Sequence, residues 1–299
     1  MSPSLTVLIP TRERAQLLGP TISSVLAAAC EAERVSGTRT EVLVVDDASQ
    51  DEGATRRVAE RYAVRYHRIT EHDGRRDPGV AIAAGVQLVE TSHHLIFGDD
   101  DAMLPMHIST AMRLVDGGAD VVSTSYWLTD ALLVPTREVV LAQPHLGDLA
   151  RGYSLVNDGA VVRTELVRDL TWDPALTGIM LLPIWVSLLL DERAFAVSTT
   201  PTWLYRRHDG NISTELSDTD RAIRGRVIAD LQAQVVARLG HLPDSPHHTE
   251  REAKAAQRAK RAAKAAAAAD PDAIKRRTRW DKRLRRDLAR RIAPNRNLD

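Results

Sequence analysis

The sequence predicts an α/β fold, a mostly parallel sheet with flanking helices, followed by a helical extension at the C-terminus. Short runs rich in Val, Ile and Leu alternate with longer amphipathic stretches about four times in the first 100 of the 299 residues. Such alternation is typical of βαβ units, in which consecutive strands are parallel. Two of the predicted strands also end in adjacent Asp residues, and the carboxyl ends of parallel strands meet at one edge of a sheet.

The predicted elements follow one another with short connections. The run at residues 5–9 is β-branched and is stopped by Pro10, as expected for a buried strand. Apolar residues at helical spacing then predict the first helix, at 15–29. The further predicted strands lie at 41–47, 64–69, 95–97, 120–128, 137–143, 196–200 and 202–205. The further predicted helices lie at 54–62, 80–90, 106–115, 164–169, 185–190 and 218–239.

Composition restricts the class of protein. A hydrophobic fraction of 43% is ordinary for a soluble domain. The single cysteine, Cys30, excludes an internal disulfide and favours a reducing compartment, so we expect the chain in the cytoplasm. We expect no signal peptide, since residues 1–4 run straight into a strand pattern. The longest apolar run, residues 178–190, is interrupted by Pro183 and is too short to cross a bilayer.

Three adjacent carboxylates follow the predicted strand at 95–97. Gly98 is succeeded by Asp99, Asp100 and Asp101. Like charges at this spacing raise each other's pKa, so a compensating cation is expected. A divalent metal is one candidate, because Mg²⁺ typically takes one or two carboxylates together with substrate phosphates. The alternative is a solvated acidic turn that caps the following helix.

Three sequence blocks resemble glycosyltransferase family 2, whose members have the GT-A fold. They are LTVLIPTR at 5–12, VVDDAS at 44–49 and FGDDDAMLP at 97–105. Their order and spacing are those of the family. The resemblance implies a metal-dependent, inverting glycosyltransferase that uses Mn²⁺ or Mg²⁺. It would move a sugar from a nucleoside-diphosphate sugar, with a UDP-sugar favoured, to a glycan, lipid, peptide or small natural product.

The resemblance also implies an organisation of the chain. Residues 1–105 would form the nucleotide-sugar-binding half of a Rossmann-like GT-A domain, and residues 106–215 its acceptor-side half. Residues 216–299 would form a basic helical extension.

The same resemblance assigns the donor-site residues. The loop after the first strand would line the pocket for the nucleotide base, and Asp47 would bind the base. Asp99 would face the ribose, while Arg76 and Arg207 would approach the diphosphate. The alternative for Arg207 is a solvated basic turn. The loop residues are Pro10, Thr11, Arg12 and Glu13.

The metal ligands are assigned in the same way. Asp100 matches the last acid of the family's D-x-D motif, although Gly98 stands at the motif's first position. Asp101 is a further candidate ligand or, alternatively, a helix cap. His208 lies in a Y-R-x-H pattern and would reach the metal or the diphosphate; the alternative is a structural hydrogen-bonding histidine.

The sequence departs from the family where the catalytic base is expected. The family places an acidic pair before a W-x-x-x-L helix, but residues 178–184, before Trp185, contain no acid. Asp173 is then our candidate base, with Asp158 and Asp191 as the other nearest acids. The missing pair also motivates a second hypothesis, a catalytically impaired nucleotide-sugar-binding or accessory protein with the same fold.

The charge of the chain is unevenly distributed. Residues 250–299 contain 17 Lys and Arg against 7 Asp and Glu, whereas the rest contains 23 against 33. A basic helix with a sparse apolar stripe can pack on the catalytic domain or on a second copy of the chain, or lie on an anionic membrane. We favour packing. The segment lacks the interleaved aromatics that stack on single strands, so no specific nucleic-acid binding is expected.

Overall fold

The structure is a computed structural model. It describes residues 4–70, 78–170, 179–211, 217–247 and 249–251, together with 257, 260 and 261. The chain divides into two compact units, Met1–Ser245 and Pro246–Asp299, and the fold described here is that of the first. Arg76, Asp173 and most of the basic C-terminal segment lie outside the described residues.

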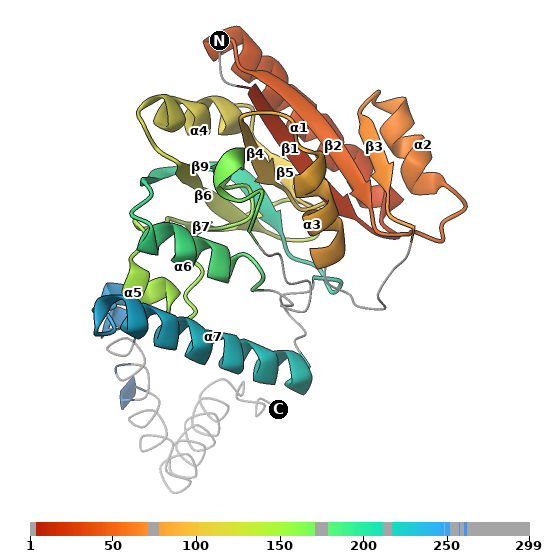
Figure 1. Cartoon of the computed structure of the whole chain (residues 1–299). Coiled ribbons are helices and arrows are strands. Elements are labelled where there is room, and N and C mark those ends of the chain that lie inside the picture. The colour runs from red at the N-terminus through yellow and green to blue at the C-terminus, as the bar shows by residue number, and fades with distance from the viewer. Residues whose placement is uncertain are drawn as a thin grey trace, which may run out of the picture. The chain divides into compact units, whose positions relative to one another are not determined.

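A nine-stranded sheet forms the centre of the first unit (Figure 1). Its order is β3-β2-β1-β4-β8-β6-β9-β5, and β7 pairs with β6. The β1–β2, β2–β3, β1–β4 and β6–β9 pairs are parallel, whereas β8, β7 and β5 join by antiparallel pairs. The strands are β1 Ser4–Thr11, β2 Arg39–Asp46, β3 Arg65–Arg68, β4 His93–Ile96, β5 Ala102–Met103, β6 Val121–Thr129, β7 Pro135–Val139, β8 Val161–Arg163 and β9 Phe195–Arg206.

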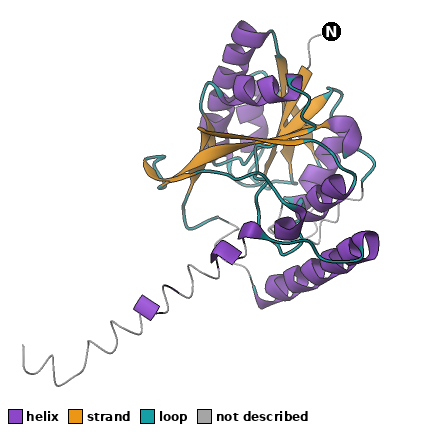
Figure 2. Ribbon diagram, turned by 90° about the vertical axis from the view of Figure 1, so that its left-hand side faces the viewer, coloured by secondary structure: helices purple, strands orange, loops and turns teal. Residues whose placement is uncertain are grey.

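Helices cover both faces of this sheet (Figure 2). α1 and α4 pack on one face, and α3, α6 and α7 pack on the other. The mixed α/β architecture predicted from the sequence is therefore confirmed. The helices are α1 Ala15–Ser36, α2 Ala54–Arg61, α3 Gly79–Leu88, α4 His107–Asp116, α5 Leu146–Leu149, α6 Leu182–Leu190 and α7 Asp218–Leu239, with a 3₁₀ turn at Thr164–Leu166.

Alternation along the strands separates two hydrophobic cores. In β1, Val7 and Ile9 face the core under α1 and α4, while Leu8 faces the core under α3 and α6. Successive strand side chains point to opposite faces, so a strand buried on both sides is apolar throughout. Each core buries the apolar stripe of its covering helices, and this burial supplies most of the stabilisation of the fold.

α7 belongs to the first compact unit and begins and ends where the sequence predicts. Ser217 and Asp220 form a capping box, in which the Ser217 hydroxyl accepts from the Asp220 amide at 3.1 Å. Gly240 ends the helix in the left-handed conformation at φ 80°. Leu231 and Val235 are buried in the same core as α6. Among the described helices, none combines the length and the apolar character that a membrane span requires.

Four predicted elements differ clearly in the structure. The first helix continues to Ser36, and only a 3₁₀ turn forms within residues 164–169. The two short strands expected around Pro201 are one strand, β9. β9 pairs with β6 over most of its length, and the register shifts where Ser125 meets Pro201. Proline has no amide hydrogen to donate, so β9 accommodates it at a position where the pairing with β6 is irregular.

Candidate functional site

The acid run, residues 99–101, lies just beyond the carboxyl end of β4. β4 pairs in parallel with β1, so the run faces the loop that follows Thr11. A Cβ on Gly98 would lie 3.1 Å from carboxylate oxygens of both Asp100 and Asp101. The tight turn therefore explains why glycine replaces the first acid of the expected motif.

Asp99 is buried and is held by two side chains from the β1–α1 loop. The Thr11 hydroxyl donates to Oδ2 at 2.7 Å, and Arg14 Nη1 donates to Oδ1 at 3.1 Å. Burial raises the pKa of Asp99 to about 6, which the charge of Arg14 opposes. The loop that was expected to line the base pocket thus also neutralises the acid run.

Asp100 shares one carboxylate oxygen between two donors. Its Oδ2 lies 3.1 Å from Arg14 Nη1 and 2.9 Å from His208 Nε2. The Gly210 amide donates to His208 Nδ1 at 3.1 Å, so that nitrogen carries no proton in this arrangement. Nε2 is then the protonated nitrogen and donates to Asp100.

Asp101 is turned toward the protein rather than the open edge. Its Oδ1 accepts from the Arg206 amide at 2.9 Å. Burial and the neighbouring Asp100 raise the pKa of Asp101 well above its ordinary value. Arg206 Nε also donates to the Asp100 carbonyl at 2.6 Å, so this arginine fastens β9 to the acid run. The Asp101 carboxylate therefore faces the protein interior, where its contact with Arg206 is structural.

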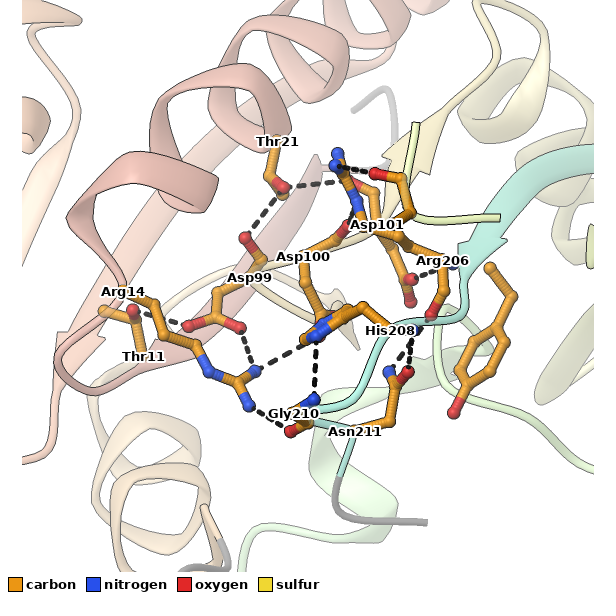
Figure 3. A network of polar contacts seen from close by, with 12 residues as sticks. Thr11, Arg14, Thr21, Asp99, Asp100, Asp101, Arg206, His208, Gly210 and Asn211 are labelled. Carbon is orange, nitrogen blue, oxygen red and sulfur yellow. Dashed lines mark hydrogen bonds and ion pairs between the residues drawn. The ribbon is translucent and has the colours of Figure 1, made fainter. Parts of the chain in front are cut away.

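A closed network links these groups (Figure 3). Arg14 Nη2 donates to the Gly210 carbonyl at 2.7 Å, and the His208 amide donates to Asn211 Oδ1. The Thr21 hydroxyl lies 2.9 and 2.7 Å from the carbonyls of Asp99 and Asp101. Residues from β1, the start of α1, β9 and the segment after β9 thereby hold the carboxylates in place.

A second feature at the same sheet edge is a cavity of about 450 Å³ at the end of β2. This size is within the range of small-molecule sites. Asp46 and Tyr66 lie in its wall, and the Tyr66 hydroxyl donates to Asp46 Oδ2 at 2.6 Å. Burial and the charge of Asp46 raise the pKa of Tyr66. Ser49, Gln50, Asp51, Glu52, Gly53, Arg56 and Arg68 complete the lining.

Of the other predicted donor-site residues that the structure describes, none is part of the lining of this cavity. Asp47 is buried, and its amide donates to the Thr11 carbonyl at 2.9 Å. The Glu13 amide donates to Ser49 Oγ at 3.0 Å, so Glu13 joins the loops after β1 and β2. Arg207 is exposed. Pro10 is buried in β1, and Arg12 is half-buried in the loop after it.

The donor set of this site fits a divalent metal only in part. Within the described residues, no group of three His, Cys, Asp or Glu side chains is arranged to hold a metal ion. Asp99 and Asp100 supply hard oxygen ligands, and two carboxylates suffice when substrate phosphates complete the shell. A cation at Asp100 Oδ2 has to displace Arg14, and His208 turns an N–H toward this oxygen.

Sequence reasoning missed the residues that complete the network. Arg14 was treated as part of a loop, and Thr21 and Asn211 received no role. A usable signal existed for Arg14, because a buried run of three acids requires a nearby cation. Thr21 acts through a backbone contact that spans 78 residues, which no sequence pattern marks. Asn211 stands in the longer pattern Y-R-x-H-x-x-N-x-S around His208 and donates to the Arg206 carbonyl.

The comparisons with known proteins concern the family and the fold. Residues 6–138 match the family model described as glycosyl transferase family 2. No curated protein matches the chain in sequence. The structure of S. aureus TarS 1-349 in complex with UDP-GlcNAc matches at TM-score 0.60 and 17% identity, over 82% of this chain and 69% of that one.

Two further solved structures show the same fold. The mannosyltransferase PcManGT from Pyrobaculum calidifontis, in complex with GDP-Man and Mn²⁺, matches at TM-score 0.50 and 15% identity, over 86% of this chain and 81% of that one. S. aureus TarS matches at TM-score 0.57 and 19% identity over 77% of this chain. Against a second structure of TarS 1-349 this chain spans 65% of that protein, and against TarS it spans 39%. Residues 6–138 of the chain therefore match glycosyl transferase family 2, and its architecture is similar to that of the GT-A glycosyltransferases.

Proposed function

We propose that the protein transfers a sugar, with inversion, from a nucleoside-diphosphate sugar to an acceptor hydroxyl or amine. One observation carries the proposal: a cavity large enough for a nucleoside and the acid run occupy the same edge of the sheet. The solved structures with this fold include complexes with UDP-GlcNAc and with GDP-Man and Mn²⁺. We favour a UDP-sugar as the donor.

The chain's own residues would orient the donor. The nucleoside would occupy the cavity at the end of β2, beside Asp46 and Tyr66. The diphosphate would then lie toward Arg14, whose planar guanidinium matches phosphate oxygens. Release of Arg14 from Asp99 and Asp100 would leave two carboxylates, which would hold Mn²⁺ or Mg²⁺. Such a cation would neutralise the charge of the departing nucleoside diphosphate.

Direct titration tests this proposal. UDP, GDP and dTDP are each titrated by calorimetry into the full chain, with and without Mn²⁺. Tight binding of one nucleotide, strengthened by Mn²⁺, is the expected result. Asp100→Ala should abolish the effect of Mn²⁺, and equal binding with and without the metal in the wild type would remove metal dependence from the proposal.

The same titration separates the two hypotheses about function. An accessory protein that keeps the donor site would bind the nucleotide but would not release UDP from a UDP-sugar under any acceptor condition. A folded chain that binds none of the three nucleotides would overturn the donor site itself.

A further inference from the structure

Transfer to a hydroxyl group releases a proton, so the proposed reaction needs a base near the acid run. None of the three acids of the run is placed for this task. Asp99 and Asp100 pair with Arg14 and are the proposed metal ligands, and Asp101 faces the Arg206 amide. The start of α6, at Leu182–Leu190, has no acid in its first turn. A further carboxylate must therefore approach from another segment.

Asp158 lies on a turn that is anchored beside the end of β4. The Gly159 amide donates to the Ile96 carbonyl at 2.7 Å, three residues before the acid run begins. On the other side, Asn157 Nδ2 donates to the Thr124 carbonyl in β6 at 2.9 Å. Gly159 adopts φ +84°, which a residue with a side chain adopts only under strain. The turn thus holds Asp158 in a defined place.

A buried histidine, His107, also holds this turn by hydrogen bonding. His107 is fully buried in α4, and its Nε2 donates to the Gly159 carbonyl at 3.2 Å. Its Nδ1 lies 2.8 Å from the Thr202 hydroxyl in β9. The flanks of the turn are buried, whereas Asp158 itself is exposed. Asp158 is therefore an accessible carboxylate on a rigid support, as a group that meets a substrate must be.

The turn that carries Asp158 lies on the β8 and β6 side of the acid run. The Gly159 amide donates to Ile96 at the end of β4, and Asn157 donates to Thr124 of β6. The cavity at the end of β2 lies on the opposite side of the acid run in the strand order. Asp158 therefore occupies the side that a donor in that cavity leaves open.

A small cavity connects Asp158 to the start of α6. Its volume is about 10 Å³, roughly enough for one water molecule, and Asp158, Leu181 and Trp185 are among its lining residues. Three buried atoms of lining residues, His94 Nε2, Asn157 Oδ1 and Trp185 Nε1, have no hydrogen-bond partner in the described part of the chain. One water that accepts from Trp185 and donates to Asn157 would satisfy both and tie α6 to the turn.

Trp185 and Leu181 mark the segment in which the sequence lacks the expected acidic pair. Because that segment and Asp158 line one cavity, the turn that carries this carboxylate is a direct neighbour of the start of α6. Two other described acids lie elsewhere. Asp191 is exposed at the C-terminal end of α6. Leu181, which lines the cavity, precedes the first turn at the other end of this helix. Asp130 Oδ1 accepts from the amides of Leu132 and Val134 within its own turn.

We propose that Asp158 is the catalytic base that removes the acceptor's proton. In the step, the acceptor O–H bond breaks and its proton passes to the Asp158 carboxylate. The acceptor oxygen forms a bond to the anomeric carbon as the bond from that carbon to the diphosphate oxygen breaks, and the nucleoside diphosphate leaves with the electron pair. This inference rests on the proposed glycosyl transfer.

Asp158→Asn in the full chain tests the inference, with Asp191→Asn as the matched control. Release of UDP from UDP-GlcNAc and UDP-glucose is measured with Mn²⁺, with water and glycerol as acceptors, alongside UDP affinity by calorimetry. Asp158→Asn should slow UDP release at least 100-fold and change UDP affinity less than twofold, because a general base contributes about 10²–10⁴-fold. Asp191→Asn should match the wild type in both measurements.

A pH profile adds a readout that a structural role would not change. The wild-type rate should fall on the acidic side as the base is protonated, and Asp158→Asn should lose that limb. A variant rate within threefold of the wild type would overturn the role of Asp158 and leave the proposed transferase intact. A wild-type chain that binds UDP yet releases none from either sugar would also overturn it, since no acceptor is then activated. Failure of the wild type to bind UDP would remove the proposed function and this inference together.

Discussion

The Nη1 atom of Arg14 lies 3.1 Å from Asp99 Oδ1 and 3.1 Å from Asp100 Oδ2. One guanidinium therefore pairs with two acids that lie beyond the end of β4. The positive charge of Arg14 therefore occupies the position that a metal ion would take beside these carboxylates. A diphosphate that approached this position would meet the same positive charge. Arg14 must therefore move away before a metal ion can bind these two carboxylates.

Removal of Arg14 should make the acid run a better cation site. We expect Arg14→Ala to tighten Mn²⁺ binding in the absence of nucleotide roughly tenfold, about 1.4 kcal/mol, because a competing positive charge is gone. The metal-free variant should also lose about 1–3 kcal/mol of stability, since Asp99 is left buried without its ion pair. Electron paramagnetic resonance of free Mn²⁺ and thermal unfolding measure the two effects.

The control for this prediction is Arg34→Ala, which removes an exposed arginine paired with Glu31 on α1. Surface pairs of this kind contribute little, so neither quantity should change appreciably. Mn²⁺ affinity that is equal in Arg14→Ala and the wild type would show that Arg14 does not compete for the carboxylates.

Tyr66 should support both the fold and the cavity at the end of β2. Tyr66→Phe removes the donor to Asp46, which is 2% exposed, and should destabilise the protein by about 1–3 kcal/mol. The raised pKa of Tyr66 keeps its hydroxyl protonated, so the difference between variant and wild type should stay constant from pH 6 to 9. Denaturant titration at several pH values checks this.

UDP affinity provides a second readout for Tyr66. If the nucleoside occupies the cavity, UDP should bind Tyr66→Phe several-fold more weakly. Tyr62→Phe, at the C-terminal end of α2 beside Gly19, serves as the control for removal of a hydroxyl. Equal weakening of UDP binding by both changes would locate the nucleoside elsewhere.

The buried His107 should make stability depend on pH below neutrality. Burial lowers its pKa from 6.5 to about 4, so between these values the unfolded chain binds a proton that the folded chain does not. The stabilisation is therefore complete above about pH 6.5 and is lost as the pH falls toward 4. From pH 7 to 5, this histidine should remove about 2 kcal/mol of stability.

His107→Gln isolates this contribution, because glutamine does not titrate. The wild type should lose about 2 kcal/mol more than the variant over the same interval, measured by urea unfolding at both pH values. His67→Gln on the partly exposed strand β3 is the control. Parallel loss in the wild type and His107→Gln would mean that His107 does not set the pH response.

Two helix glycines should respond to alanine in opposite directions. A Cβ at Gly85 in α3 would collide with Leu8 of β1, so Gly85→Ala should destabilise the chain by about 1–3 kcal/mol. A Cβ at Gly225 in α7 meets no atom within 4 Å, so Gly225→Ala should stabilise it by about 0.5–1 kcal/mol. Thermal unfolding of the two variants side by side checks the packing of α3 on the sheet.

The sequence alone determined the local elements and the chemistry of one sheet edge. The apolar run of β1, the spacing along α1 and the capping box of α7 depend on residues a few positions apart, so they are readable from the chain. The acid run was predicted to lie at a ligand-binding edge, because parallel strands align their carboxyl ends. The match to the family over residues 6–138 supports that interpretation.

Only the tertiary structure decided which partners meet at that edge. Arg14 and Asp99 are 85 residues apart, and Asp100 and His208 are 108 apart. These contacts arise because β1 pairs with β4 and because β9 runs as one strand past Pro201 to return His208 to the acid run. The position of Asp158 beside the start of α6 depends likewise on long-range packing. Local periodicity records which face of an element is buried, whereas such contacts depend on how the elements pair and pack in space.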